Sequence, residues 1–449
     1  MAQVLRKDIT LDEMALMERT IYRCIFGGRS FFNEIKRLRG DEYVEVERGN
    51  LEVKQLKVDW PCGGEKDFEQ NVKKAAAALR EDIRIANKVL GAPSIYVTGG
   101  LDSRLVLAAC LANNVKPKLI TITGHSQISL LPYSNQQDKK VAEGYSKRYG
   151  LEFVTPDCSS PEPIDKDWEQ LISNHGFPAA YFWGTTEVLK GTLTGIANHM
   201  HLLGFGGELL RVNLFKSPAI GAEEFAERLA HKVFDVDVAE RVEPSFPEHM
   251  KKLIEDEFIH YGIDVENASV DEMYPMDVAY RSQANTHSQA LSHHVIYAYN
   301  PLFEYNVLKN RVSRKLADNA KFQIAITNEL YPDIFEMPIW SGNQHKVLNR
   351  ESMLLESPSY VSDTLYNSKL SVFIRTISPV GLKKILRPIK RFIYSCSGKN
   401  FNNAAMPGFV YPEFMFKEQK YTISDKAFIE RENANLWSVF HKTLKMLDF

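Results

Sequence analysis

Residues Ser94 to Ser103 read S-I-Y-V-T-G-G-L-D-S. The stretch opens with a short run of β-forming residues, turns at Gly99-Gly100, and continues into an apolar helical run over residues 104–111. Strand, tight turn and helix predict an anion cradle, because glycines let the backbone approach a phosphate and a helix start offers N–H groups with partial positive charge. The stretch therefore predicts an α/β fold with a phosphate-binding loop at a strand end.

The side chains of this loop predict that a polyphosphate binds together with a metal ion. The hydroxyls of Thr98 and Ser103 can donate hydrogen bonds to phosphate oxygens. Asp102 carries the opposite kind of charge, and a carboxylate facing phosphates is favourable chiefly when it holds Mg²⁺ between itself and the nucleotide. The residues expected to bind the phosphates are Thr98, Gly99, Gly100, Leu101, Asp102 and Ser103.

The motif T-G-G-L-D-S resembles the S-G-G-x-D-S pyrophosphate loop of the N-type ATP pyrophosphatases. With its D-S-R continuation, it most resembles the synthetase domain of the asparagine synthetase family, and the resemblance covers roughly residues 25–346. It implies a doubly wound parallel sheet of the adenine nucleotide alpha-hydrolase-like (HUP) type, with extra helices and a small N-terminal β-hairpin. It also implies ATP and Mg²⁺ as cofactors.

A second glycine-rich turn lies in residues 199–211, H-M-H-L-L-G-F-G-G-E-L-L-R. It resembles the family's second loop, roughly G-E-G-x-D-E, and the alignment puts Gly206 at the pyrophosphate and Glu208 at the metal-binding aspartate. We therefore expect Asp102 and Glu208 to share the metal. Phe205 stands where the family places an acid credited with proton handling, which puts the usual base in doubt. The alternating histidines of this stretch are read as strand residues, because two histidines alone make a poor metal site.

Periodic segments around the first loop predict the core unit. Residues 68–90 form an amphipathic helix that ends at a glycine, with apolar residues at spacings of three and four. Strands over 118–123 and 151–155 alternate with a helix over 134–149, which argues for a parallel, doubly wound sheet. Because ligands of such sheets sit at the carboxyl ends of the strands, Thr123 is expected at the nucleotide.

Three units are predicted along the chain: residues 1–60, 61–350 and a mostly helical extension over 351–449. The first contains a β-hairpin around Arg48-Gly49-Asn50. Its sequence resembles only the tail of the glutaminase domain that precedes the synthetase domain in the family. Ala2 replaces the required N-terminal cysteine, so we expect no in-chain glutaminase. Nitrogen would come from free ammonia, a separate subunit or an amine-bearing substrate.

Two basic residues are candidates for catalysis. Arg281 precedes N-P-L-F-E, which resembles the family's "P-F-L-D" segment over the acceptor pocket, although Tyr297 replaces the glutamate before it. Arg281 can bind a carboxylate or phosphate, or it is a surface arginine. Lys346 ends L-Y-P-D-I-F-E-M-P-I-W-S-G-N-Q-H-K, which resembles the region where the family presents a lysine to the acyl-adenylate. A lysine there would neutralise charge developing in the transition state.

Composition bounds the remaining possibilities. The 449 residues carry a net charge of −2, so the overall charge gives no indication that the protein binds nucleic acid. Five scattered cysteines without a C-x-x-C pair suit a reducing compartment without structural zinc. The charged start lacks a signal peptide's apolar core, and no run of about 18 apolar residues occurs. The expected location is the cytoplasm.

A basic amphipathic pattern over residues 382–393 is interrupted by Pro388. Such a pattern is typical of a packed helix, and it also suits peripheral contact with an anionic membrane.

The resemblance implies an ATP-dependent, AMP-forming carbon–nitrogen ligase. ATP would adenylate the carboxylate of a small metabolite, peptide or sugar acid, and ammonia or an amine would then form the amide. Two alternatives remain open. One is a tRNA-modifying pyrophosphatase, although such relatives usually place the loop near the chain start and carry a basic surface. The other is a catalytically lapsed scaffold that keeps nucleotide binding, for which Phe205 and Tyr297 are the motivation.

Overall fold

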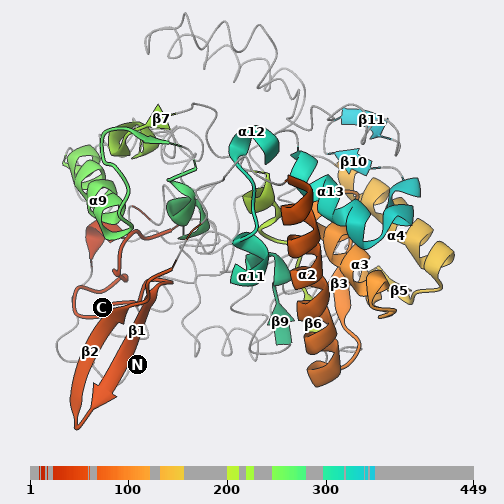
Figure 1. Cartoon of the computed structure of the whole chain (residues 1–449), viewed down its shortest axis with the longest axis horizontal. Helices are drawn as coiled ribbons and strands as arrows, with labels where there is room; N and C mark the ends of the chain where they lie inside the picture. Colours follow the sequence, from red (N-terminus) through yellow and green to blue (C-terminus); the bar gives the residue numbers. More distant parts are fainter. Residues whose placement is uncertain are drawn as a thin grey trace, which may run out of the picture.

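The structure is a computed structural model, shown in Figure 1. It describes residues 10, 12–15, 18, 24–58, 60, 68–121, 132–155, 200–211, 219–226, 245–269, 271–279, 297–317, 320–337, 339–341 and 344–348. The predicted C-terminal extension over 351–449, with its basic pattern, lies outside the described residues, as do Thr123 and Arg281.

A five-stranded parallel sheet organises the fold. Its strands, in spatial order, are β5 (Phe153–Val154), β4 (Lys118–Ile120), β3 (Ser94–Tyr96), β6 (Met200–Leu202) and β9 (Tyr297–Tyr299), and each neighbouring pair is parallel. The chain moves outward from β3 through β4 to β5 and then returns to the other side of β3 at β6. The direction of winding therefore reverses between β3 and β6, where sheets of this kind bind their ligands. The predicted α/β fold with a parallel sheet is confirmed.

Three helices pack against one another beside β3: α2 (Phe68–Leu90), α3 (Leu101–Ala112) and α13 (Lys321–Leu330). The helix predicted over 68–90 is confirmed with the same bounds, and Gly91 follows it at a φ of +82°. Its buried face is made of Val72, Ala75, Ala76, Leu79 and Ile83. α3 is buried along most of its length because its sequence is apolar nearly all round, as expected for a central helix.

The remaining elements surround this unit. They are α4 (Pro132–Tyr149), β1 (Glu42–Glu47), β2 (Asn50–Gln55), β7 (Ala219–Ile220), α9 (Phe246–His260), β8 (Ala268–Ser269), α11 (Tyr305–Leu308), α12 (Arg314–Ala317), β10 (Ile339–Ser341), β11 (Gln344–Leu348), and the short helices η1 (Gly207–Leu210), η2 (Pro301–Phe303) and η4 (Pro332–Glu336). In Figure 1, α9 and the pair β1–β2 lie to the left of α2, whereas α3, α4 and α13 lie to its right.

The predicted N-terminal hairpin is confirmed as β1 and β2. Glu47 pairs with Asn50, so the loop is the two residues Arg48 and Gly49, with φ angles of +50° and +85°. Positive φ at both positions is typical of a type I′ turn, whose twist matches that of the strands it joins. The hairpin carries an apolar face of Val44, Val46, Leu51 and Val53, all of which are exposed.

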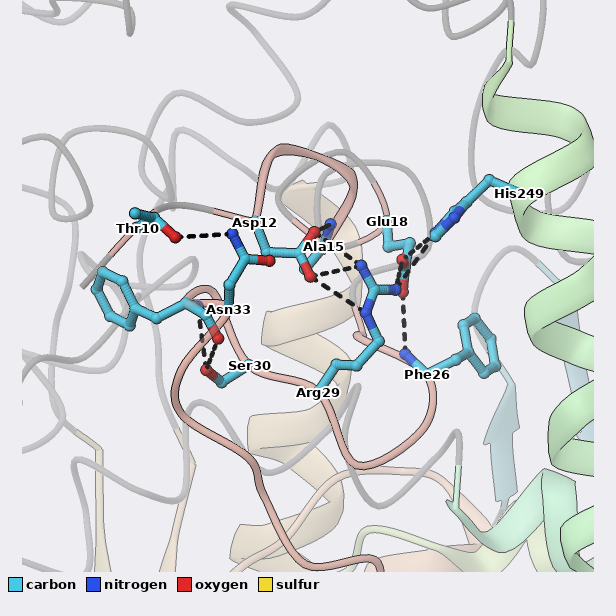
Figure 2. Close-up of polar contacts among 10 residues, drawn as sticks. Thr10, Asp12, Ala15, Glu18, Phe26, Arg29, Ser30, Asn33 and His249 are labelled. Carbon is cyan, nitrogen blue, oxygen red and sulfur yellow. Dashed lines mark hydrogen bonds and ion pairs between the residues drawn. The ribbon is translucent and has the colours of Figure 1, made fainter. Parts of the chain in front are cut away.

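A cluster of charged residues joins the N-terminal segment to α9 (Figure 2). Arg29 binds Asp12 through Nη2, 2.7 Å from each carboxylate oxygen, and forms an ion pair with Glu18 through Nη1. Glu18 is fully buried, and its Oε1 lies 2.9 Å from Nε2 of His249 on α9. Its other oxygen accepts the Phe26 N–H at 3.1 Å. The cluster therefore fixes segments that are far apart in sequence.

The hydrophobic core also includes the N-terminal segment. Cys24 and Phe26 belong to the same cluster of buried residues as the apolar faces of α2, α3 and α13. Within the described residues, no helix combines the length and apolarity needed to cross a membrane.

Candidate functional site

The predicted phosphate loop connects β3 to α3. Gly100 is the N-cap of α3 and adopts an extended conformation, with φ −75° and ψ 176°. The backbone N–H of Thr98 donates to Ser103 Oγ at 3.1 Å, and the two side-chain hydroxyl oxygens lie 3.2 Å apart. The Gly100 N–H donates to Thr98 Oγ1 at 3.3 Å. The loop's own hydroxyls therefore hold it in shape.

Asp138 brings a carboxylate to this loop from α4. Its Oδ1 accepts the N–H of Gly99 at 2.6 Å. Burial raises the pKa of Asp138, and the hydrogen bond from Gly99 acts in the opposite direction. An anion that binds the Gly99 amide must compete with this carboxylate.

The second glycine-rich loop follows β6 and packs directly against the first. A Cβ at Gly204 would lie 2.9 Å from the backbone N of Ser103, and a Cβ at Gly207 would lie 2.1 Å from Asp102 Oδ1. Gly206 has a φ of +90°, and a Cβ there would lie 2.8 Å from the ring of Phe303 in η2. Three glycines thus let the loops after β3, β6 and β9 approach one another. A side chain at Gly204 would collide with backbone, and one at Gly206 or Gly207 would displace the Phe303 ring or the Asp102 carboxylate.

Asp102 lies where the two loops meet, and its carboxylate accepts hydrogen bonds from Arg211 and Gln323. Arg211, which follows η1, donates from Nη2 to both carboxylate oxygens, at 2.8 and 2.9 Å. Gln323 on α13 donates from Nε2 to Oδ1 at 2.7 Å. Gln323 is fully buried, and the side chains of Arg211 and Asp102 are 10% and 23% exposed. The carboxylate is therefore mostly removed from water and neutralised by an internal cation.

The donor types at this point fit Mg²⁺. Asp102 and the half-buried Glu208 belong to loops that contact each other, and carboxylate oxygens are ligands that Mg²⁺ prefers. Within the part of the chain that the structure describes, no group of three or more His, Cys, Asp and Glu side chains is arranged to hold a metal. Mg²⁺ commonly binds through one or two carboxylates together with substrate phosphates, so a two-carboxylate set suits a metal that arrives with a nucleotide.

Of the two residues that depart from the pattern of the resembled family, one lies in the second loop and the other at the opposite end of the parallel strands, where Tyr297 pairs with Met200. Phe205 follows Gly204 and is 42% exposed, and Tyr297 at the start of β9 is 59% exposed. Neither side chain can act as the carboxylate base that the pattern would place there.

The structure brings together most of the predicted binding residues. The loop from Thr98 to Ser103, Gly206 and Glu208 all lie after β3 and β6, on the two sides of the winding reversal. Lys346 lies in β11, whose side chains are not described. The predictions for Thr123 and Arg281 remain predictions.

Sequence reasoning missed three residues at the site. Arg211 ends the second glycine-rich stretch, three residues after the candidate metal ligand Glu208. This position could have indicated that its guanidinium lies at the site. Asp138 lies in the helix predicted over 134–149, where no binding residue was expected. No sequence feature marked Gln323 as a partner of Asp102, because the two lie 221 residues apart and meet only through the packing of α13.

Comparisons with known proteins do not extend this picture. No protein-family model matches the chain, and a search of curated proteins returns no match. The function is therefore argued from the residues and geometry of the site.

Proposed function

We propose that this protein is an ATP-dependent ligase that adenylates a substrate carboxylate and passes the acyl group to ammonia or an amine. The observation that carries the proposal is the contact of two glycine-rich loops at the winding reversal between β3 and β6, with Asp102 between them. On this proposal the sheet is of the HUP type, and the loop from Thr98 to Ser103 binds the pyrophosphate end of ATP.

The reaction has two steps that the loops would serve differently. A carboxylate oxygen of the substrate attacks the α-phosphorus, and the bond to the bridging oxygen breaks to release pyrophosphate. The amine nitrogen then attacks the acyl carbon, the bond to AMP breaks, and the nitrogen loses a proton. Thr98 and Ser103 would donate hydrogen bonds to the departing pyrophosphate in place of their contacts within the loop, and the Gly99 amide would hold it in place of Asp138.

Asp102 and Glu208 would hold the Mg²⁺, which when bound neutralises charge on the phosphates. Arg281 would bind a carboxylate or phosphate, and Lys346 would face the charge that develops on the acyl-adenylate. Phe205 has no proton-accepting group, so another residue or the substrate would take the proton from the amine. The substrate would be the carboxylate of a small metabolite, a peptide or a sugar acid.

The test measures pyrophosphate released from ATP and Mg²⁺ in the presence of pooled carboxylates and amines. The natural protein, Asp102→Asn and the control Asp256→Asn are compared, because Asp256 is an exposed aspartate on α9. We expect release by the natural protein and the control, and a loss of about 100-fold or more in Asp102→Asn. Equal release by all three would refute a catalytic site at this loop.

One observation favours a second candidate, a nucleotide-binding scaffold without catalysis. The ion pair between Asp102 and Arg211 neutralises the carboxylate without a metal, as a lapsed site would allow. ATP binding without pyrophosphate release from any carboxylate–amine pair would support the scaffold.

A further inference from the structure

Arg211 occupies both oxygens of the carboxylate that the proposed function assigns to the metal. Its Nη2 lies 2.8 and 2.9 Å from the two oxygens of Asp102, and Gln323 supplies a third hydrogen bond to Oδ1. A divalent cation on the same carboxylate would face a guanidinium at close range in a mostly buried site, where like charges repel strongly. Metal binding and the present contacts of Arg211 therefore compete.

The backbone around Arg211 keeps the side chain at the nucleotide end of the sheet even if Asp102 is given up. Its N–H donates to the carbonyl of Glu208 at 3.0 Å, and its Nε donates to the carbonyl of Gly207 at 3.4 Å. These contacts anchor Arg211 to the loop that approaches Asp102. A guanidinium released there remains beside the first loop, where a polyphosphate offers it another anionic partner.

We propose that Asp102, Arg211 and Gln323 form an electrostatic latch that couples metal binding to nucleotide binding. Without nucleotide, Arg211 neutralises Asp102 and disfavours a metal ion. When ATP binds, its phosphates form ion pairs with the Arg211 guanidinium. Asp102 then becomes available to bind the metal that accompanies the nucleotide. This inference rests on the proposed function, and it adds that Arg211 is a positioning residue which makes metal and ATP bind together.

The latch predicts changes of opposite sign in Arg211→Gln, whereas loss of a merely structural residue would weaken both kinds of binding. The first measurement is Mn²⁺ binding without nucleotide, followed by electron paramagnetic resonance. We expect Arg211→Gln to bind Mn²⁺ at least about tenfold more tightly than the natural protein. The second measurement is binding of α,β-methylene-ATP in EDTA, where we expect the same variant to bind at least about tenfold more weakly.

Two controls accompany these titrations. Arg84→Gln removes an arginine from an exposed ion pair with Glu81 on α2, so we expect both affinities to stay unchanged. Arg211→Lys keeps the positive charge, so its Mn²⁺ affinity should stay within about threefold of the natural protein.

If Arg211→Gln does not fold, as judged by circular dichroism and thermal unfolding, Asp102→Asn is used to test the proposal instead. It frees Arg211 for phosphate, so metal-free α,β-methylene-ATP should bind at least about tenfold more tightly than to the natural protein. Unchanged affinities in the folded variants would overturn the latch alone. A natural protein that binds neither Mn²⁺ nor the nucleotide analogue, separately or together, would overturn the proposed function as well.

Discussion

His201 illustrates how the sheet fixes the charge of a single side chain. It lies on β6, is 1% exposed, and its Nδ1 is 2.7 Å from the hydroxyl oxygen of Ser94 on β3. The ring of Tyr96 meets it edge to face, with centroids 4.2 Å apart. Burial lowers the pKa of His201 from 6.5 to about 3, so the imidazole stays neutral at ordinary pH. Its interpretation as a strand residue rather than a metal ligand agrees with this position.

The buried histidine predicts a loss of stability in mild acid. The unfolded chain binds a proton at His201 below about pH 6.5, whereas the folded protein does so only near pH 3, so this stability is present above pH 6.5 and is lost as the pH falls. The expected loss between pH 7.5 and pH 5 is about 2 kcal/mol. Thermal unfolding at the two pH values should show a smaller loss in His201→Gln. An equal loss in both proteins would contradict the assignment.

At the scale of single residues, the sequence pointed to candidate site residues but not to their contacts. Asp102 was recognisable because its neighbours along the chain, a glycine pair and a helix start, define its surroundings. The partners of Asp102 were not recognisable from the sequence, because Arg211 and Gln323 lie 109 and 221 residues away and meet it only in the folded chain.

Secondary-structure elements were predictable where one periodicity dominates. α2 matches its predicted bounds because its apolar residues recur at helical spacing and a glycine ends it. β4 was expected over 118–123, but the structure gives Lys118–Ile120, and residues 122 and 123 lie outside the described part. Strands of this length carry too few residues to fix their ends from sequence.

The loop after β6 allows a test at the scale of an element. Gly207→Ala would bring a Cβ to 2.1 Å from Asp102 Oδ1 and 2.8 Å from Gln323 Nε2, so both side chains must be displaced. We expect a loss of about 1 kcal/mol of stability and weaker nucleotide binding, measured by chemical unfolding and by titration with the ATP analogue. Gly40→Ala is the matched control, because a Cβ there meets nothing within 4 Å. Similar losses in both variants would contradict the close contact between the loops.

At the scale of the whole molecule, the strand order was beyond the sequence. Alternation of strands and helices predicted a parallel sheet, and this is confirmed. The return of the chain to the free side of β3 depends on pairing between Ser94 and His201, which lie 107 residues apart. No local pattern encodes such a pairing, although it decides which two loops face each other.

The charged cluster of Figure 2 predicts a large cost for separating the N-terminal segment from α9. Glu18→Ala would remove the carboxylate that both Arg29 and His249 contact, in a site where Glu18 is fully buried. The expected loss is about 3 kcal/mol, measured by thermal unfolding. Glu45→Ala breaks a more exposed ion pair with Lys54 and should cost less than about 1 kcal/mol. Equal costs would mean that the buried cluster contributes no more than a surface pair.

The close approach at Gly204, Gly206 and Gly207 also constrains how this sequence can diverge. Each of the three positions faces a different neighbour, respectively the backbone of Ser103, the ring of Phe303 and the carboxylate of Asp102. A larger residue at any of them would be accepted only after a compensating change in a segment far away in the chain. Among descendants of this protein, substitutions in the second loop should therefore appear jointly with substitutions in the first loop or after β9. Single replacements at these glycines should be removed by selection.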